Sequence, residues 1–261
     1  MRSSDFPNER DLMPYEASSF VASRVVVFAP HPDDEVFGCG GALADLRERG
    51  ARVDVILVTD GAAGARNEEE RGRIASARRE ESRCALEALG GGTVHAGGLP
   101  DRGLGGRLPE IEALLARWLV EAAPDLVFAP SPVETHPDHR AVAMALFRVA
   151  ARPASDAAAR ALDAATVAFF ELSQPFRPNF LVDITRSLAR KERAMGAFVS
   201  QAAARDYAGF VAGLSAYRRM TLSRDVLAVE AYSVVGGFQL RSDPRGVVRG
   251  LLPIAPAVMG G

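Results

Sequence analysis

Three of the four histidines in this chain lie in two short clusters of similar sequence. The first cluster, HPDDE, occupies residues 31–35, and the second, HPDHR, occupies residues 136–140. Imidazoles and carboxylates together suit Zn²⁺ or Fe²⁺, and a catalytic zinc takes three protein ligands and keeps a fourth position for water. The clusters therefore predict one metal site suited to hydrolysis. The candidate side chains are His31, Asp33, Asp34, Glu35, His136, Asp138 and His139.

A purely structural role is the alternative for each cluster. A single HPD tripeptide after a strand is commonly a turn whose aspartate caps the next helix, and Asp138 fits that role. Two such tripeptides in a chain with one other histidine, His95, favour a shared site instead. His95 stands alone in an apolar run, and we expect it to be a core residue with a satisfied ring.

The elements that would position the clusters follow an α/β pattern. Short apolar runs alternate with longer segments of helical period, and the first four runs lack the alternation of half-exposed strands, so we expect both faces of these strands to be buried. This order predicts a Rossmann-like, mostly parallel sheet with helices on both faces, in a single domain. The expected strands cover residues 24–30, 53–60, 93–98, 125–131, 166–172, 179–185 and 226–235.

Both clusters follow expected strands directly. HPDDE comes after the strand at 24–30 and HPDHR comes after the strand at 125–131. Ligands of open α/β sheets bind outside the carboxyl ends of the strands, where the strand order reverses. We expect these two strands to be neighbours there, so that the clusters face one crevice. The domain is expected over residues 21–240, with a polar tail at 1–20 and a second tail at 241–261.

Composition narrows the class of partner. The chain has 261 residues, 48% of them hydrophobic and 25% charged, with a formal net charge of −2. This balance is typical of a soluble globular protein and argues against nucleic acid or an anionic membrane as the main partner. Residues 1–20 lack an apolar stretch, so we expect a cytoplasmic protein without a membrane span. The partner is expected to be a small molecule, and a homo-oligomer stays open.

The motifs resemble one known family. APHPDDEVFGCGG, HPDHR and the looser match KERAMGAFVSQ are similar to the PIG-L/LmbE-like family of metal-dependent de-N-acetylases, over about residues 24–201. The resemblance implies a hydrolase that removes the N-acetyl group from an N-acetylglucosamine-type amino sugar conjugate, releasing acetate and a free amine. It also implies Zn²⁺, or another divalent metal such as Fe²⁺. The implied metal ligands are His31, Asp34 and His139, with Asp33 as the general base.

The resemblance assigns further roles around the metal. It implies that His136 is the general acid or the oxyanion partner and that Asp138 orients it; whether His136 or protonated Asp33 is the acid stays open. Some relatives carry a tyrosine where this chain has Glu134, which leaves Glu134 as a candidate substrate contact. Family loops that contact the sugar correspond to residues 61–67 and 99–106. The substrate-binding candidates from these loops are Arg66 and Asp101.

Three other functions stay open from the sequence. One is an amidase that cuts a different acyl-amide, such as a thiol conjugate. Another, from a different class, is a mononuclear iron oxygenase, which uses two histidines and a carboxylate. The third is a non-catalytic binding protein that kept the scaffold, and the presence of Asp33 beside the candidate ligands argues against it.

Overall fold

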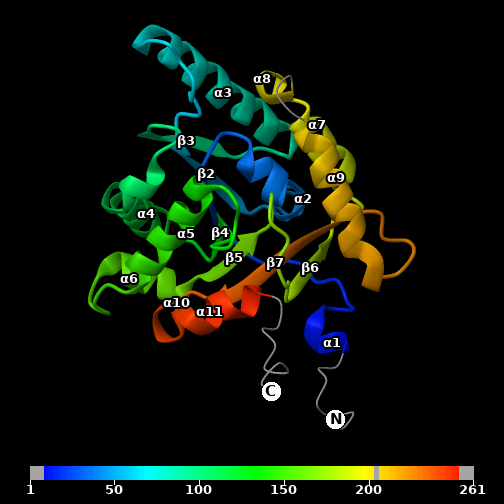
Figure 1. The fold of residues 1–261 in the computed structure, drawn as a ribbon. Coiled ribbons are helices and arrows are strands. Elements are labelled where there is room, and N and C mark those ends of the chain that lie inside the picture. Colours follow the sequence, from blue (N-terminus) through cyan, green and yellow to red (C-terminus); the bar gives the residue numbers. More distant parts are fainter. Residues whose placement is uncertain (1–8, 203–205, 253–261) are drawn as a thin grey trace, which may run out of the picture.

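The protein is built around a seven-stranded sheet (Figure 1). The computed structural model describes residues 9–202 and 206–252. The sheet order is β3-β2-β1-β4-β5-β7-β6; the first five strands in this order pair in parallel, and β7 is antiparallel to both β5 and β6. The mostly parallel sheet expected from the sequence is therefore confirmed. The strands are β1 (Arg24–Ala29), β2 (Arg52–Thr59), β3 (Thr93–Leu99), β4 (Leu126–Pro130), β5 (Thr166–Phe170), β6 (Phe180–Asp183) and β7 (Val229–Gly236).

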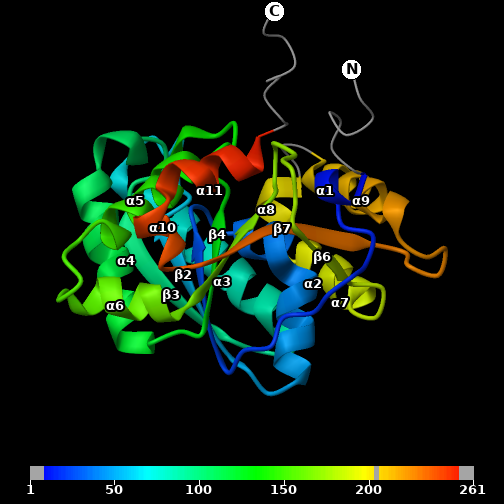
Figure 2. The ribbon, with the colours of Figure 1, turned by 90° about the horizontal axis from the view of Figure 1, so that it is seen from below.

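Helices cover both faces of the sheet (Figures 1 and 2). Side chains of α2, α3 and α7 share one apolar core with the sheet, and side chains of α4, α5, α6, α10 and α11 share the other. Helix α9 packs against β7. The helices are α1 (Glu9–Leu12), α2 (Asp34–Glu48), α3 (Glu68–Ala88), α4 (Leu108–Ala122), α5 (Pro137–Ala150), α6 (Ala157–Ala164), α7 (Leu188–Met195), α8 (Val199–Ala202), α9 (Tyr207–Arg218), α10 (Gln239–Ser242) and α11 (Pro244–Leu251), with 3-10 turns η2 (Leu104–Gly106) and η3 (Arg219–Thr221).

Strand burial follows position in the sheet. Strands β1, β2 and β4 are buried along almost their whole length, as their unbroken apolar sequences predict. The same expectation is wrong for β3, whose residues are all at least partly exposed. Strand β3 lies at the edge of the sheet, where it has a neighbour on one side only. Apolar sequence alone does not distinguish an edge strand from a central one.

Packed structure extends past both ends of the domain expected from the sequence. The ring of Phe20 lies 5.1 Å from the rings of Phe128 and Tyr232, so this residue of the expected N-terminal tail belongs to the core. At the other end, α11 buries Val247 and Leu251. No helix in residues 9–202 and 206–252 combines the length and the apolar character needed to cross a bilayer.

The strand order of the sheet reverses between β1 and β4, which pair directly. From their carboxyl ends the chain runs into α2 on one face and into α5 on the other. This arrangement confirms the expected adjacency and brings the two histidine clusters to the same edge of the sheet.

Candidate metal and catalytic site

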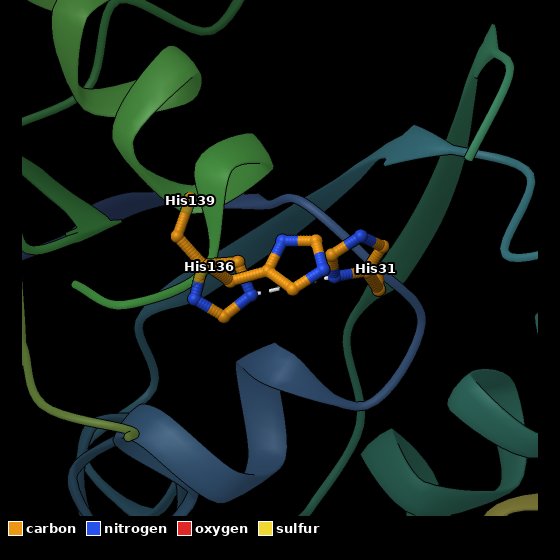
Figure 3. A group of neighbouring side chains, drawn as sticks. All are labelled: His31, His136 and His139. Carbon is orange, nitrogen blue, oxygen red and sulfur yellow. Dashed lines mark hydrogen bonds between the residues drawn. The ribbon is translucent and has the colours of Figure 1, made fainter. Parts of the chain in front are cut away.

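The three clustered histidines meet between the amino-terminal ends of α2 and α5 (Figure 3). The ring centroid of His31 lies 4.8 Å from that of His136 and 5.3 Å from that of His139. The rings of His136 and His139 are 5.0 Å apart. Two segments separated by about a hundred residues of sequence therefore form one cluster of imidazoles, as predicted.

Three donor atoms form a compact triangle. Nδ1 of His31 lies 3.1 Å from Oδ2 of Asp34 and 3.3 Å from Nε2 of His139. The third edge, from Nε2 of His139 to Oδ2 of Asp34, is also 3.3 Å. Metal–ligand bonds of about 2.0–2.1 Å in a tetrahedral site place neighbouring donors about 3.3 Å apart. The triangle therefore fits a divalent ion with three protein ligands.

Two wider groupings share His31 with this triangle. Ligand atoms of His31, His136 and His139 lie within 4.8 Å of one another, and so do those of His31, Asp101 and Asp138. In the second grouping, Nε2 of His31 is 3.2 Å from Oδ1 of Asp101 and 3.4 Å from Oδ2 of Asp138. With a metal bound, these carboxylates would accept a proton held on Nε2, and the Nδ1 lone pair of His31 would then face the ion beside Asp34 and His139.

Asp33 is buried beside the triangle in a strained backbone conformation. Its φ is 133°, a region that non-glycine residues seldom occupy and that costs of order 1–3 kcal/mol. Its amide donates to Glu35 at 3.0 Å, and its Oδ2 accepts from Arg78 at 3.0 Å. Burial, reinforced by the charge of Asp34, raises the pKa of Asp33 well above its usual value, although Arg78 opposes the shift.

Arg78, on α3, was missed by the sequence reasoning. It is 5% exposed, and besides Asp33 it donates to the carbonyls of Gly61 and Pro32, both at 2.7 Å. A signal was present: Arg78, Ser82 and Ala85 share one side of α3 at helical spacing, and that side is buried. The many arginines and glutamates around it concealed this pattern.

Asp34 is held in its ionised form. Burial alone would raise the pKa of Asp34, but the charge of His139 and hydrogen bonds from His139 and His31 outweigh burial and hold the pKa well below its usual value. The backbone amide of His31 also donates to Oδ2 of Asp34, at 2.9 Å. The carboxylate is therefore fixed before any ligand arrives.

The second cluster begins α5. His136 is the N-cap residue, and its Nδ1 accepts from the amide of Asp138 at 3.2 Å, which leaves the proton on Nε2. Burial lowers the pKa of His136, and the charges of His31 and His139 lower it further. A neutral ring with a proton on Nε2 is suited to donate a hydrogen bond.

The side chain of Asp138 forms no hydrogen bond with His136, although the resemblance implied that it orients this ring. Its carboxylate accepts from the backbone amides of residues 102–104 at 3.0–3.3 Å and lies 3.4 Å from Nε2 of His31. His136 is oriented by the Asp138 backbone amide instead. The difference arises because Asp138 lies inside the first turn of α5, where its side chain points to the loop after β3.

Glu134 is 1% exposed, so it is not placed to contact a substrate. Its carboxylate accepts from the amides of Leu172 at 2.8 Å and Ser173 at 3.1 Å. Oε2 of Glu134 also lies 3.7 Å from Nδ1 of His139, a buried nitrogen with no hydrogen-bond partner. A carboxylate behind the outer nitrogen of a histidine is the usual means of orienting a metal ligand.

The two substrate-binding candidates lie in different settings. The side chain of Asp101 is 9% exposed, contacts His31 and accepts from the amide of Ala63 at 3.3 Å. The side chain of Arg66 is 84% exposed and pairs with Glu70 at 3.0 Å. The structure thus brings Asp101 into the site and leaves Arg66 at the surface; substrate binding by either residue stays a prediction.

The fourth histidine, His95, lies on the edge strand β3, away from the site. Its ring forms a hydrogen bond with Asp54 at 2.8 Å.

Comparisons with known proteins agree with this geometry. Residues 26–150 match the family model described as PIG-L: GlcNAc-PI de-N-acetylase. The chain is also 31% identical to the diacetylchitobiose deacetylase of Thermococcus kodakarensis over 191 residues, which covers 68% of this chain and 70% of the relative. This chain belongs to the PIG-L family.

Solved structures show how widely the PIG-L fold is shared. The N,N'-diacetylchitobiose deacetylase from Pyrococcus horikoshii, solved with an inhibitor, superposes with a TM-score of 0.68 at 26% identity, covering 84% of this chain and 85% of that one. GalB, the 4-carboxy-2-hydroxymuconate hydratase from Pseudomonas putida KT2440, gives a TM-score of 0.61 at 24% identity, over 81% of this chain and 96% of that one. The second likeness concerns the fold alone, so function has to be argued from the site.

Proposed function

We propose that this protein is a metal-dependent hydrolase that removes the N-acetyl group from an N-acetylglucosamine-type amino sugar conjugate, releasing acetate and a free amine. The observation that carries the proposal is the donor triangle of His31, Asp34 and His139 with the Asp33 carboxylate beside it. Membership of the PIG-L family supports the reaction class, and the named relative acts on diacetylchitobiose.

The triangle residues would hold the metal. Two imidazole nitrogens and one carboxylate oxygen suit Zn²⁺, and Fe²⁺ accepts the same donors. When bound, such an ion lowers the pKa of a coordinated water to about 7 and polarises a carbonyl group. The partners of the triangle, Asp101 and Asp138 behind His31 and Glu134 behind His139, would fix the two rings.

Asp33 would accept the proton that the attacking water releases. Arg78 and the strained backbone hold its carboxylate in one orientation, so little reorganisation is needed when the proton moves. The proton then has to reach the nitrogen of the departing amine. Either protonated Asp33 or His136 would deliver it, and both groups lie at the site.

His136 would stabilise the oxyanion that forms on the acetamide oxygen. Its Nδ1 accepts from the Asp138 amide, so the proton of the neutral ring lies on Nε2, which would donate to the acetamide oxygen. A fixed donor of this kind contributes roughly 10²–10³ to the rate in other acyl-transfer sites. Glu134, where some relatives carry a tyrosine, is buried and cannot replace this donor.

The proposal is tested with a panel of N-acetylglucosaminides. Protein loaded with Zn²⁺ is incubated with each compound, and mass spectrometry follows the loss of one acetyl group while an enzymatic assay follows acetate. We expect at least one compound to lose acetyl, with no oxygen consumed. The matched controls are His139→Ala, expected to be inactive, and His95→Gln, which changes a histidine at the sheet edge and should leave turnover intact.

Two results would contradict the proposal. Release of a different acyl group, with every N-acetyl compound unchanged, would support an amidase acting on another conjugate. Oxygen consumption with a 2-oxoacid, together with loss of activity under argon, would support an iron oxygenase.

A further inference from the structure

Helix α2 carries Asp34 in its first turn and is broken one turn later. Cys39 has φ −140° and ψ 17°, which are not helical values. In a regular helix the amide of Gly41 would donate to the carbonyl of Phe37. Here the Gly41 amide donates to Oε1 of Glu230 at 2.7 Å, and the Phe37 carbonyl accepts from Nζ of Lys191 at 3.0 Å.

Lys191 and Glu230 also pair with each other. Nζ of Lys191 lies 2.7 Å from Oε1 of Glu230, so the ion pair joins the two backbone groups across the break in α2. The other oxygen, Oε2, accepts from the amide of Ala42 at 2.8 Å and from the hydroxyl of Tyr232 at 2.6 Å. We call Lys191 and Glu230 the α2 clamp. One partner comes from α7 and the other from β7.

Burial makes the α2 clamp unusual. Lys191 is 2% exposed and Glu230 is 4% exposed. Lys191 is the only lysine in the chain and lies among charged residues in the segment RKERAMGAF, yet its side chain is buried. A buried ion pair costs desolvation energy, and an apolar replacement of the pair is often as stable. Global stability alone is therefore a weak reason for placing these charges here.

The α2 clamp acts close to the proposed metal site. The turn before the break contains Asp34, and the amides of Val36 and Phe37 donate to the carbonyl of Asp33, both at 3.0 Å. Phe37 thus connects the turn to Asp33 through its amide and to Lys191 through its carbonyl. On the same turn, Gly38 leaves no room for a Cβ against the ring of Phe170.

We propose that Lys191 and Glu230 are positioning residues for the metal site. Through Phe37 and Gly41 they fix the turn of α2 that carries Asp34, and so set its carboxylate at the right distance from His31 and His139. This inference rests on the proposed function, since it takes Asp34 to be a metal ligand. It predicts that loss of the α2 clamp weakens metal binding in a protein that still folds.

The test measures the Kd for Zn²⁺ by competition with a chromophoric chelator, on full-length wild type, Lys191→Met and Lys191→Arg. Lys191→Met should weaken Zn²⁺ binding about 10- to 100-fold, the usual effect of losing support behind a ligand, and Lys191→Arg should recover part of the loss. The absorption spectrum of the Co²⁺-substituted protein should change with Lys191→Met. Glu230→Gln, which keeps the size of the side chain, is measured in parallel in case Lys191→Met does not fold.

A matched control separates positioning from general destabilisation. Val247→Ala removes methyl groups from the opposite core and should lower the melting temperature without changing the Kd for Zn²⁺. Wild-type affinity in folded Lys191→Met or Glu230→Gln protein would overturn the role of the α2 clamp and leave the proposed function standing. Failure of the wild-type protein to bind either Zn²⁺ or Fe²⁺ would overturn the proposed function, and this inference with it.

Discussion

The two histidine clusters share the tripeptide HPD, but the chain uses it in two different ways. In the first cluster the helix begins at Asp34, after the tripeptide, so His31 lies in the loop and faces the helix. In the second the helix begins at Pro137, inside the tripeptide, so His136 is the N-cap residue. The residue after each tripeptide, Asp34 or His139, reaches the donor triangle, whereas only the first of the two leading histidines does so.

The third position differs just as much. Asp33 has a positive φ and an arginine partner, whereas Asp138 is helical and binds the amides of a neighbouring loop. Identical letters therefore take different roles, because the backbone around each tripeptide directs the side chains differently. Similar motifs in one chain do not imply similar functions for matching positions.

The largest effects are expected when each histidine of the second cluster is replaced in turn by alanine. His139→Ala should lose stoichiometric metal and all measurable turnover, because it removes one corner of the donor triangle. His136→Ala should keep the metal and lose roughly 10²–10³ in kcat, the effect of removing an oxyanion donor. Elemental analysis and steady-state kinetics measure both. Loss of metal in His136→Ala alone would show that the ligand roles are reversed.

Asp33→Asn should lower kcat by about 10²–10⁴ while metal content stays at the wild-type level. The amide keeps the size of the carboxylate but cannot accept the proton of water. Asparagine also tolerates positive φ better than most residues, so the fold should persist. Mass detection of acetyl loss gives the rate, and elemental analysis gives the metal. Near-wild-type turnover in this variant would exclude Asp33 as the general base.

Asp138→Asn should weaken metal binding, and its effect should be smaller than that of Asp33→Asn on kcat. Its carboxylate supports His31 and the loop at 102–104, so we expect the Kd for Zn²⁺ to rise about 10-fold. Chelator competition measures the change, and His95→Gln serves as the control. An unchanged Kd combined with a large fall in kcat would place Asp138 in the chemistry instead.

The smallest expected effect is the difference in the free energy of unfolding between a glycine and an alanine variant, which should have opposite signs at Asp33 and Asp138. At residue 33, glycine should be more stable than alanine by about 1 kcal/mol or more, because glycine adopts a φ of 133° without strain. At residue 138, glycine should be less stable than alanine by about 1 kcal/mol, because the residue is helical. Urea unfolding of the four variants without metal measures both differences. The same sign at both positions would show that the strain at Asp33 is absent in solution.

Much of the fold followed from local sequence. Unbroken apolar runs predicted the strands. Residues typical of helix ends also lie where the helices end or begin: Gly50, with a positive φ, follows α2, and Pro109 lies in the first turn of α4. The position of both clusters after strands 24–30 and 125–131 predicted that they would meet. The packing of Phe20 and of α11 was not predicted, because Phe20 is a single apolar residue after a polar stretch and α11 has only eight residues, fewer than a periodicity needs to be recognised.

The sequence by itself determined the donor types and the sheet, since metal ligands are few in kind and a parallel sheet places its strand ends together. Only the tertiary structure decided which charged residues are buried. Arg78, Glu134 and Lys191 each occupy a polar stretch that reads as solvated, yet each is buried. A charged side chain is buried only where it has an ion-pair or hydrogen-bond partner, and that partner can be distant in sequence. Glu230, for example, accepts a hydrogen bond from the amide of Gly41, 189 residues away in the sequence. No local pattern records such a pairing, because its free energy exists only once the chain has folded.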